Sequence, residues 1–325
     1  MKKIKQIIYI CILACFINFF VSNTYCLTNN EVEIQSSINQ KNYEVSPREN
    51  AINLLLNSDW TMAEINDLLT EKDMTVYENA NKVIYDTNYI KISTNEFGEI
   101  STQEVTKSIY DYERNKYLLE ENNSVDNHIN KLGSNGKLFL TPLANTEGSV
   151  TANDDTNYLK QTISAVWMGN MKFSVSYRFE WLKTPNVRDL DIFAIQWDTR
   201  IGACTSQYEG FVYKYDLYGK TEECLTPVTW SYDTYGIYMC FNLNANANSS
   251  NHRGYMRTLA EIKNVSSQYS FYGKYMHAWS HIPNVPLISF EPNAMSNDTP
   301  LVVMGNEGIY NYQKPGVRVF VSSPN

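Results

Sequence analysis

Two histidines four residues apart, His277 and His281, form the spacing in this 325-residue sequence that most suggests metal chemistry. On an α-helix, that separation places two imidazoles on one face, where they can bind zinc. The segment instead reads as a β-strand running toward Pro283, and Ala278 stands where a zinc protease would carry its glutamate. The sequence therefore predicts no metal site here, and nothing in it indicates a cofactor.

Three cysteines beyond the N-terminal segment, Cys204, Cys224 and Cys240, allow more than one chemistry. A thiol beside an imidazole can act as a nucleophile, so Cys240 would form such a pair with His277 if folding brought them together. Outside the cell one disulfide is also permitted, either Cys204–Cys224 or Cys224–Cys240. Three reduced, half-buried cysteines are the remaining alternative.

Acidic residues occur in two short loop clusters, Asp154-Asp155 and Asp189-Leu190-Asp191. Such clusters can contribute to calcium binding, although loop acids are usually only solvated. The sequence contains no G-x-S-x-G elbow, P-loop or EF-hand loop. No local pattern indicates the paired carboxylates of a glycosidase. Binding is therefore favoured over catalysis, without excluding an enzyme.

Aromatic residues are the positive signal, because residues 151–325 hold 15 of the 24 tyrosines and five of the six tryptophans. Tyrosine combines a flat apolar ring with a polar tip, which suits a wet binding face that stacks on sugar rings or on a peptide. The loops 242–255 and 305–316 would frame such a face. A core stripe with cross-strand pairs is the commoner use of such residues and the alternative here. The candidate ligand contacts are Tyr272, Trp279, Tyr310 and Tyr312, with the polar residues His252, Arg253 and His277.

The elements that would position these residues are mostly β-strands. In 171-MKFSVSYRFEW-181 every odd position is apolar or aromatic and every even position is polar, which predicts a strand with one buried face. Phe173 to Phe179 should then face the core at odd positions, with Ser174, Ser176 and Arg178 facing water or a neighbouring layer. Short strands at this spacing are typical of a β-sandwich or an open barrel. The expected strands are 158–167, 171–182, 190–197, 210–218, 228–241, 254–262, 268–279, 285–290, 301–304 and 316–321.

The turn before this strand determines its pairing with strand 158–167. A two-residue turn at Gly169-Asn170 would place apolar residues opposite polar ones. A three-residue loop over 168–170 pairs Trp167 with Met171 and brings both apolar sets onto one face. Asn170 would close this loop with a positive φ.

The N-terminal region predicts a small helical module. Ser46-Pro47-Arg48-Glu49 and Thr61-Met62-Ala63-Glu64 have the form of capping boxes, and apolar residues at helical spacing follow each. Residues 82–93 predict a β-hairpin that turns at Asp86-Thr87-Asn88.

The expected fold class is α+β, with a small N-terminal helical module and β-hairpin followed by a larger, mostly antiparallel, sandwich-like β-domain. The module covers 46–95 and the β-domain 158–325, which we expect to fold alone from about Thr151. Between them, 96–157 should hold a helix within 102–121 and a polar linker.

The first 26 residues have the three parts of a secretory signal peptide: early lysines, an apolar run over 7–21, and small residues before a cleavage site at Cys26. The apolar run is short for a membrane span, although an uncleaved anchor stays open. We expect a disordered arm over 27–45 and a secreted or cell-surface mature chain without a transmembrane segment.

The charge distribution excludes one class of partner. The formal net charge of −8 becomes −11 without residues 1–26, which hold three lysines and no acid. Residues 27–150 carry 10 basic and 20 acidic side chains, so the acidity belongs to the N-terminal part. An acidic chain without a basic patch argues against nucleic acid as a partner and against attraction to anionic membranes.

The segments 158-YLKQTISAVWMGNMKFSVSYRFEWLKTP-185 and 58-SDWTMAEINDLL-69 resemble patterns in an uncharacterised family of secreted proteins of Gram-positive bacteria with no assigned activity. The resemblance implies a bacterial extracellular protein and assigns no catalytic residue. We expect a secreted or cell-surface, non-catalytic β-sandwich protein that binds a glycan, a cell-wall polymer or a protein partner. The alternatives are an extracellular hydrolase and a membrane-active β-protein.

Overall fold

The structure is a computed structural model, and Val45–Asn325 forms one compact unit of it. The expectations for the signal peptide 1–26, for the arm up to residue 44 and for most of the linker over 122–157 concern residues outside those described. Residues 155–157 of the predicted linker instead begin a strand, β3 (Asp155–Gly169). Within the described residues, no helix has the length and apolar character needed to cross a membrane. The described residues are 45–94, 99–117, 119, 155–185, 188–203, 208–218, 220–246, 248–278, 287–290, 302–304, 310–312 and 317–322.

Three helices come first, α2 (Pro47–Leu56), α3 (Met62–Leu68) and α4 (Glu71–Glu78), and residues 107–117 are also helical. The rest of the described chain is mainly strands. Their bounds are β1 (Val83–Thr94), β2 (Ile100–Val105), β3 (Asp155–Gly169), β4 (Lys172–Trp181), β5 (Leu190–Trp197), β6 (Ile201–Ala203), β7 (Gly210–Leu217), β8 (Lys220–Cys224), β9 (Thr229–Asp233), β10 (Gly236–Asn242), β11 (Ser249–Ile262), β12 (Gln268–Ala278), β13 (Leu287–Ser289), β14 (Val302–Met304), β15 (Tyr310–Tyr312) and β16 (Val317–Ser322).

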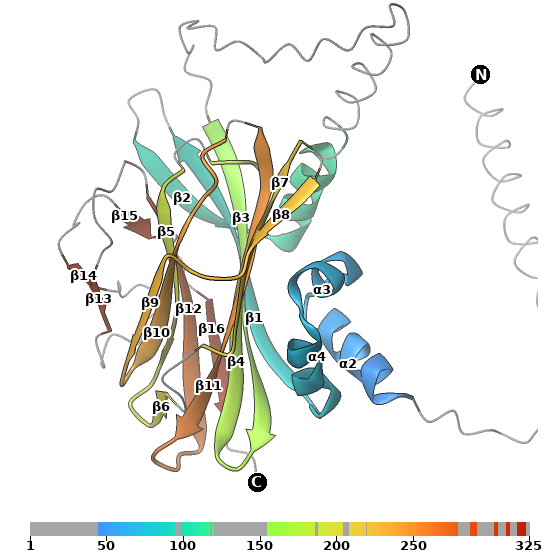
Figure 1. The fold of residues 1–325 in the computed structure, drawn as a ribbon, viewed down its shortest axis with the longest axis vertical. Coiled ribbons are helices and arrows are strands. Elements are labelled where there is room, and N and C mark those ends of the chain that lie inside the picture. Colours follow the sequence, from blue (N-terminus) through green and yellow to red (C-terminus); the bar gives the residue numbers. More distant parts are fainter. Residues whose placement is uncertain are drawn as a thin grey trace, which may run out of the picture. The chain divides into compact units, whose positions relative to one another are not determined.

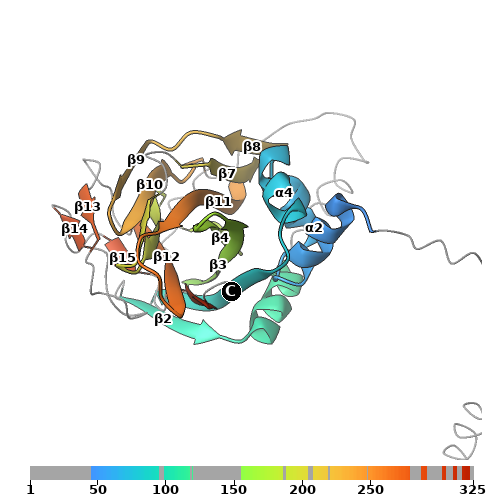
Figure 2. The same cartoon turned by 90° about the horizontal axis from the view of Figure 1, so that it is seen from below.

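The strands form two antiparallel sheets that face each other (Figure 1, and in the perpendicular view of Figure 2). The first sheet has the order β2-β1-β3-β4-β11-β7-β8, with β6 paired to β11. The second has the order β15-β12-β5-β10-β9, with β16 paired to β12, and β13 pairs with β14 separately. The expected α+β class with a large β-sandwich is confirmed.

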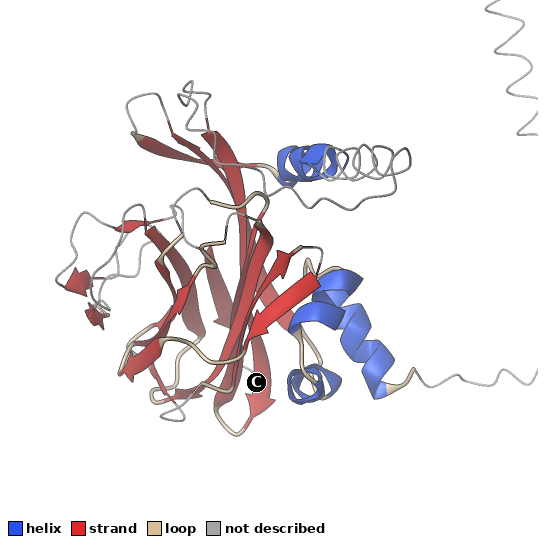
Figure 3. Cartoon of the chain, turned by 45° about the horizontal axis from the view of Figure 1, so that its top comes forward, coloured by secondary structure: helices blue, strands red, loops and turns tan. Residues whose placement is uncertain are grey.

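The main core lies between the two sheets. It includes Phe173, Val175, Tyr177 and Phe179 of β4, as the alternation predicted, packed against Phe193 and other residues of the second sheet. The even positions Ser174, Ser176 and Arg178 of β4 are also buried, because the helices cover the other face of the first sheet (Figure 3). The polar face of β4 therefore meets a neighbouring layer and not water.

The register of the β3–β4 hairpin differs from the prediction. Trp167 pairs with Phe173, not with Met171, and Gly169 pairs with Lys172 across a two-residue turn. A bulge between Trp167 and Gly169 adds one unpaired residue to β3. The apolar residues of β3 and β4 therefore still lie on the same face, which a two-residue turn without the bulge would prevent. Asn170 has the expected positive φ of 49°, and Met171 follows at 61°.

The predicted helix starts are confirmed. Ser46 Oγ accepts a hydrogen bond from the Glu49 amide, and Thr61 and Glu64 form a reciprocal capping box. The sequence analysis missed α4, although Thr70 and Asp73 form the same kind of box at its start. The helix expected over 102–121 is confirmed over 107–117, whereas residues 102–105 belong to the unpredicted strand β2.

A β-hairpin does follow the helices, but its turn is not at Asp86-Thr87-Asn88. These three residues lie within β1, which runs unbroken from Val83 to Thr94 and pairs with β2 on one side and with β3 on the other. All twelve residues of β1 pair with β3. Residues 46–95 thus contribute a strand to the sheet of the β-domain.

Most other strands lie where they were expected. The predicted strand 228–241 is two strands, β9 and β10, because the chain turns at Thr234-Tyr235. The short strands β6, β8 and β15 were not predicted.

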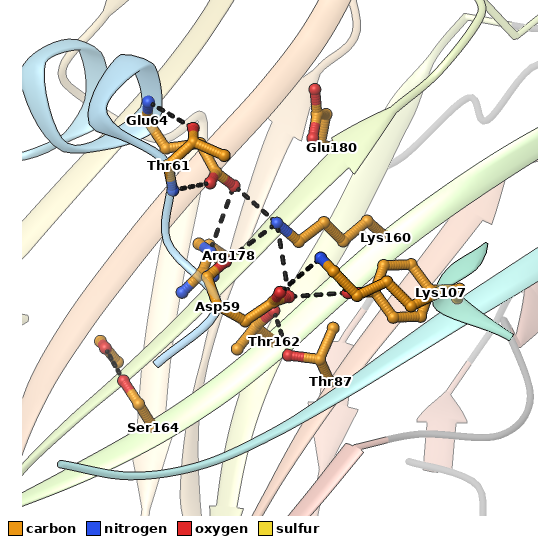
Figure 4. Close-up of polar contacts among 12 residues, drawn as sticks. Asp59, Thr61, Glu64, Thr87, Lys107, Lys160, Thr162, Ser164, Arg178 and Glu180 are labelled. Carbon is orange, nitrogen blue, oxygen red and sulfur yellow. Dashed lines mark hydrogen bonds and ion pairs between the residues drawn. The ribbon is translucent and has the colours of Figure 1, made fainter. Parts of the chain in front are cut away.

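Ion pairs attach the acidic helices to the first sheet. Lys160 of β3 lies 3.0 Å from the Glu64 carboxylate, and Arg178 of β4 lies 3.5 Å from it (Figure 4). Burial alone would raise the pKa of Glu64, but Arg178 and Lys160 hold it below its ordinary value. Asp59 pairs with Lys107 at 2.7 Å in the same cluster. Carboxylates of the acidic N-terminal part are therefore paired with lysine and arginine side chains of the sheet.

The same pattern continues toward the other end of the helices. Asp67 pairs with Arg253 of β11 and with Lys214 of β7, and Asp73 pairs with Arg257 of β11 at 2.7 Å. Arg253 is thus occupied by the helical layer and is not an exposed ligand contact.

Candidate functional site

A buried cluster of titratable side chains joins β5 and β12 in the core. The His277 Nδ1 atom lies 2.8 Å from an Asp191 carboxylate oxygen, and the Tyr275 hydroxyl donates to the same carboxylate. Trp181 Nε1 donates to the Tyr275 oxygen at 3.0 Å. Since the side chains of Asp191 and His277 are 0% exposed, a substrate has no access to them in this structure.

Cys240 and His277 do not form a thiol–imidazole pair. Cys240 pairs with Ile192, and Met276 also pairs with Ile192, so these three share the outer face of the second sheet. His277 neighbours Met276 in the strand and points to the inner face with Asp191. Burial raises the pKa of Cys240 to about 12, which removes its nucleophilic thiolate at neutral pH.

Cys224 and Cys240 are both free, so the Cys224–Cys240 disulfide is not formed. Cys204 lies outside the described residues, as do His281 and Asp154. Among the residues that the structure describes, no cluster of three or more metal-binding side chains occurs.

An open cleft lies at one end of the β-sandwich, with a volume of about 590 Å³. It is bounded by β7 and β8 on one side and by the start of the asparagine-rich loop after β10 on the other. The lining residues are Arg188, Asp189, Tyr213, Tyr215, Cys224, Thr226, Val228, Phe241, Asn242, Leu243, Asn244 and Ala245.

The aromatic wall of this cleft is a group of packed rings. The ring of Tyr213 lies 5.6 Å from that of Tyr215 and 5.0 Å from that of Phe241, measured between centroids. Tyr213 is buried, whereas Tyr215 is only half-buried, with its ring centroid 6.0 Å from that of His252. Tyr215 is therefore the ring that a ligand can reach.

The polar wall is held by its own hydrogen bonds. The backbone amide of Asn244 donates to the Tyr213 hydroxyl at 3.0 Å, and Ser249 Oγ donates to the backbone carbonyl of Asn244 at 3.0 Å. Arg188 donates to the Asn246 carbonyl. The loop is thus fixed next to the aromatic wall.

His252 lies behind the cleft and does not line it. Its Nδ1 atom is 2.6 Å from the Tyr213 hydroxyl, and its Nε2 atom is 3.3 Å from Ser249 Oγ. A β-bulge at Ser250–Arg253, with Asn251 at a φ of 51°, turns His252 inward and Arg253 toward the helices. Of the two residues nominated from the sequence, His252 therefore supports the cleft wall through Tyr213, while Arg253 lies on the opposite face of β11 and pairs with Asp67.

The stability of the protein should decrease as His252 becomes protonated in the unfolded chain. Burial, followed by Arg188 and Arg253, lowers the pKa of His252 to about 4, against about 6.5 in an unfolded chain. Between these values only the unfolded state binds the proton, so the free energy of unfolding should fall by about 3 kcal/mol as the pH drops from 6.5 to 4.

Urea unfolding at several pH values would measure this loss. Other acid-sensitive groups contribute to the same window, so the comparison is with His252→Gln, which cannot titrate. The variant should be less stable at pH 7 and should lose less stability on acidification. Parallel pH profiles for the two proteins would contradict the assignment.

The other expected ligand contacts do not form an exposed face. Tyr272 is only 2% exposed, because the Arg318 guanidinium lies 4.6 Å from its ring. Tyr310 and Tyr312 lie on β15, where they pair with Ala278 and Met276. Their side chains, and Trp279, lie outside the described residues.

The sequence analysis missed the cleft residues Arg188, Tyr213, Tyr215 and Phe241. A signal was present in Tyr213-x-Tyr215, which places two tyrosines on one face of a predicted strand. The expected framing loop 242–255 does contribute Asn242 to Ala245 to the cleft.

Comparisons with known proteins identify no family. No family model matches the chain, and no curated protein matches it. A solved structure, the collagen binding domain of Erysipelothrix rhusiopathiae surface protein RspB, aligns with 51% of this chain and 66% of its own length, at 5% identity. The aligned part is slightly less than two thirds of that domain. The TM-score of 0.21 is too low to indicate a shared fold.

Proposed function

We propose that this protein is a secreted or cell-surface binding protein without catalytic activity, whose cleft holds a saccharide unit of a glycan or cell-wall polymer. The observation that carries the proposal is the meeting of an accessible aromatic ring, Tyr215, with Arg188, Asp189, Asn242 and Asn244 in one open cleft.

The chemistry of the lining fits a sugar. A saccharide ring has an apolar C–H face, which packs on an aromatic ring, and a rim of hydroxyl groups, which need donors and acceptors. Tyr215 offers the ring, and the carboxylate, amide and guanidinium groups of the cleft offer the polar partners. A site with one accessible apolar wall and a few polar groups opposite it suits reversible binding.

The same geometry disfavours the hydrolase alternative. A glycosidase of the usual kind needs two carboxyl groups about 5–9.5 Å apart across the bond that it cleaves. Asp189 is the one carboxylate among the described residues that line the cleft. The Asp191–His277 pair is enclosed in the core and therefore supplies no second acid to a ligand.

Replacing the accessible ring should weaken saccharide binding. A glycan array and purified Gram-positive cell walls would identify a ligand of the full chain, and titration calorimetry would give its affinity. Tyr215→Ala should lower that affinity at least tenfold, which is about 1.4 kcal/mol, and Tyr215→Phe should retain most of it.

Tyr85→Ala is the matched control, because Tyr85 is an exposed tyrosine of β1 that does not line the cleft. Its affinity should equal that of the unmodified protein. A chain that binds no glycan or cell wall, or that tolerates Tyr215→Ala without loss, would refute the proposed function.

A further inference from the structure

A row of side chains along β9 begins at Val228, at the margin of the cleft. This residue lines the cleft, and its amide donates to the Cys240 carbonyl at 2.8 Å, so it extends the pairing of β9 with β10 by one residue. Trp230 and Tyr232 follow at two-residue steps along β9, and they pair with Met239 and Ile237, which belong to the main core. All three side chains therefore lie on the same face of β9.

This row stays accessible because of its place in the sheet. β9 is the last strand of its sheet and, among the described strands, pairs only with β10. Val228 is 51% exposed and Tyr232 is 44% exposed, while Trp230 is half-buried against Tyr208. The ring planes of Trp230 and Tyr232 are within 21° of parallel. Exposed apolar side chains in contiguous rows mark binding surfaces more often than scattered ones do.

We infer that the ligand is a linear oligosaccharide, with one unit in the cleft and the following units along the row Val228–Trp230–Tyr232. The inference rests on the proposed function. From Val228 to Tyr232 the strand advances about 13 Å, which is longer than one sugar ring. The side chains of the row are apolar or aromatic, as stacking on successive sugar faces requires, and the hydroxyl-binding groups stay in the cleft.

An extended peptide is the competing occupant of an edge strand, because it could hydrogen-bond to the backbone edge of β9 that pairs with no other described strand. The saccharide is favoured because the row continues a cleft lined with amide, carboxylate and guanidinium groups around an aromatic ring. Backbone pairing with a peptide would not depend on the ring of Tyr232 in particular.

The affinity of the full chain for β-1,4-linked N-acetylglucosamine oligomers of one to six units tests the inference by calorimetry. The affinity should rise at least tenfold from the single sugar to the tetrasaccharide. Tyr232→Ala should abolish this rise and leave the affinity for the single sugar unchanged, whereas Tyr232→Phe should preserve it. Circular dichroism would confirm that each variant is folded, and Tyr85→Ala again serves as the control.

Equal affinity at every length, or an equal loss for short and long oligomers in Tyr232→Ala, would overturn the inference. The proposed function would survive either of these results, provided that Tyr215→Ala abolished binding of the single sugar. Binding of extended peptides at β9, without a gain in affinity as the saccharide lengthens, would also overturn the inference of an oligosaccharide ligand. Failure of every oligomer to bind would count against both ideas.

Discussion

A chain that begins at Thr151 is expected to lose cooperative unfolding, whereas a chain that begins at Val45 should keep it. The shorter chain lacks β1, which pairs with β3 along twelve residues. It also lacks the helices that cover Val166, Val212 and Tyr255 on the outer face of the first sheet. An unpaired strand edge and an uncovered apolar face both favour aggregation over folding. The sequence alone led to the opposite prediction, that residues from 151 onward fold alone, and unfolding of the two chains decides between them.

Urea and thermal unfolding of the two chains, followed by circular dichroism, would measure the difference. A third chain that begins at Ala80 separates the two causes, because it keeps β1 and removes α2, α3 and α4. It should unfold cooperatively at a lower urea concentration than the chain from Val45. A sharp β-type transition in the chain from Thr151, at the same urea concentration as the longer chain, would show that β1 is dispensable.

Most strands of the β-sandwich could be predicted because one face of each carries apolar side chains into the core between the sheets, and this imposes a two-residue period on the sequence. Alternation predicted which residues of β4 face the core, and capping residues predicted where α2 and α3 begin. Both patterns are local in the sequence. The two-residue turn at Asn170-Met171 could not be foreseen, since it needs a positive φ at Met171, a residue that seldom adopts one.

The turn assigned to Asp86-Thr87-Asn88 was wrong for a related reason. These residues favour turns when nothing else constrains them. In the structure they pair with Ile163, Thr162 and Gln161 of β3, and that pairing outweighs their local preference. Contacts between distant segments therefore decided what these residues form.

The candidate site was harder to predict than the fold. Alternation shows which side of a strand an aromatic ring lies on, but not whether another element covers that side. Tyr272 is covered by Arg318 of β16, whereas Tyr232 is 44% exposed on β9, the last strand of its sheet, and Tyr215 is half-buried on β7. The order of strands in a sheet is a property of the whole chain, and a single strand does not reveal it.

Removing one carboxylate between the helices and the sheet should strongly destabilise the protein. Glu64 is the shared partner of Lys160 and Arg178, whose side chains are almost completely buried. Glu64→Ala would leave two buried cations short of a counter-charge, and breaking a buried ion pair in this way costs about 3–5 kcal/mol. The loss should lie nearer the lower value, because Asp59 stays 3.5 Å from Lys160 and the Trp60 ring lies 4.0 Å from the Arg178 guanidinium.

Urea unfolding of Glu64→Ala and of Glu71→Ala makes the matched comparison. Glu71 pairs with Arg48 on the surface of the same helical layer, but its side chain is 88% exposed, so its removal should cost under about 1 kcal/mol. A triple variant, Glu64→Leu with Lys160→Met and Arg178→Met, should recover most of the stability, since a buried ionic group replaced by apolar residues is often neutral or better. If the triple variant were as unstable as Glu64→Ala alone, the loss would come from packing and capping and not from the uncompensated charges. If Glu64→Ala were no more damaging than Glu71→Ala, the ion pairs of Figure 4 would not hold the helices to the sheet.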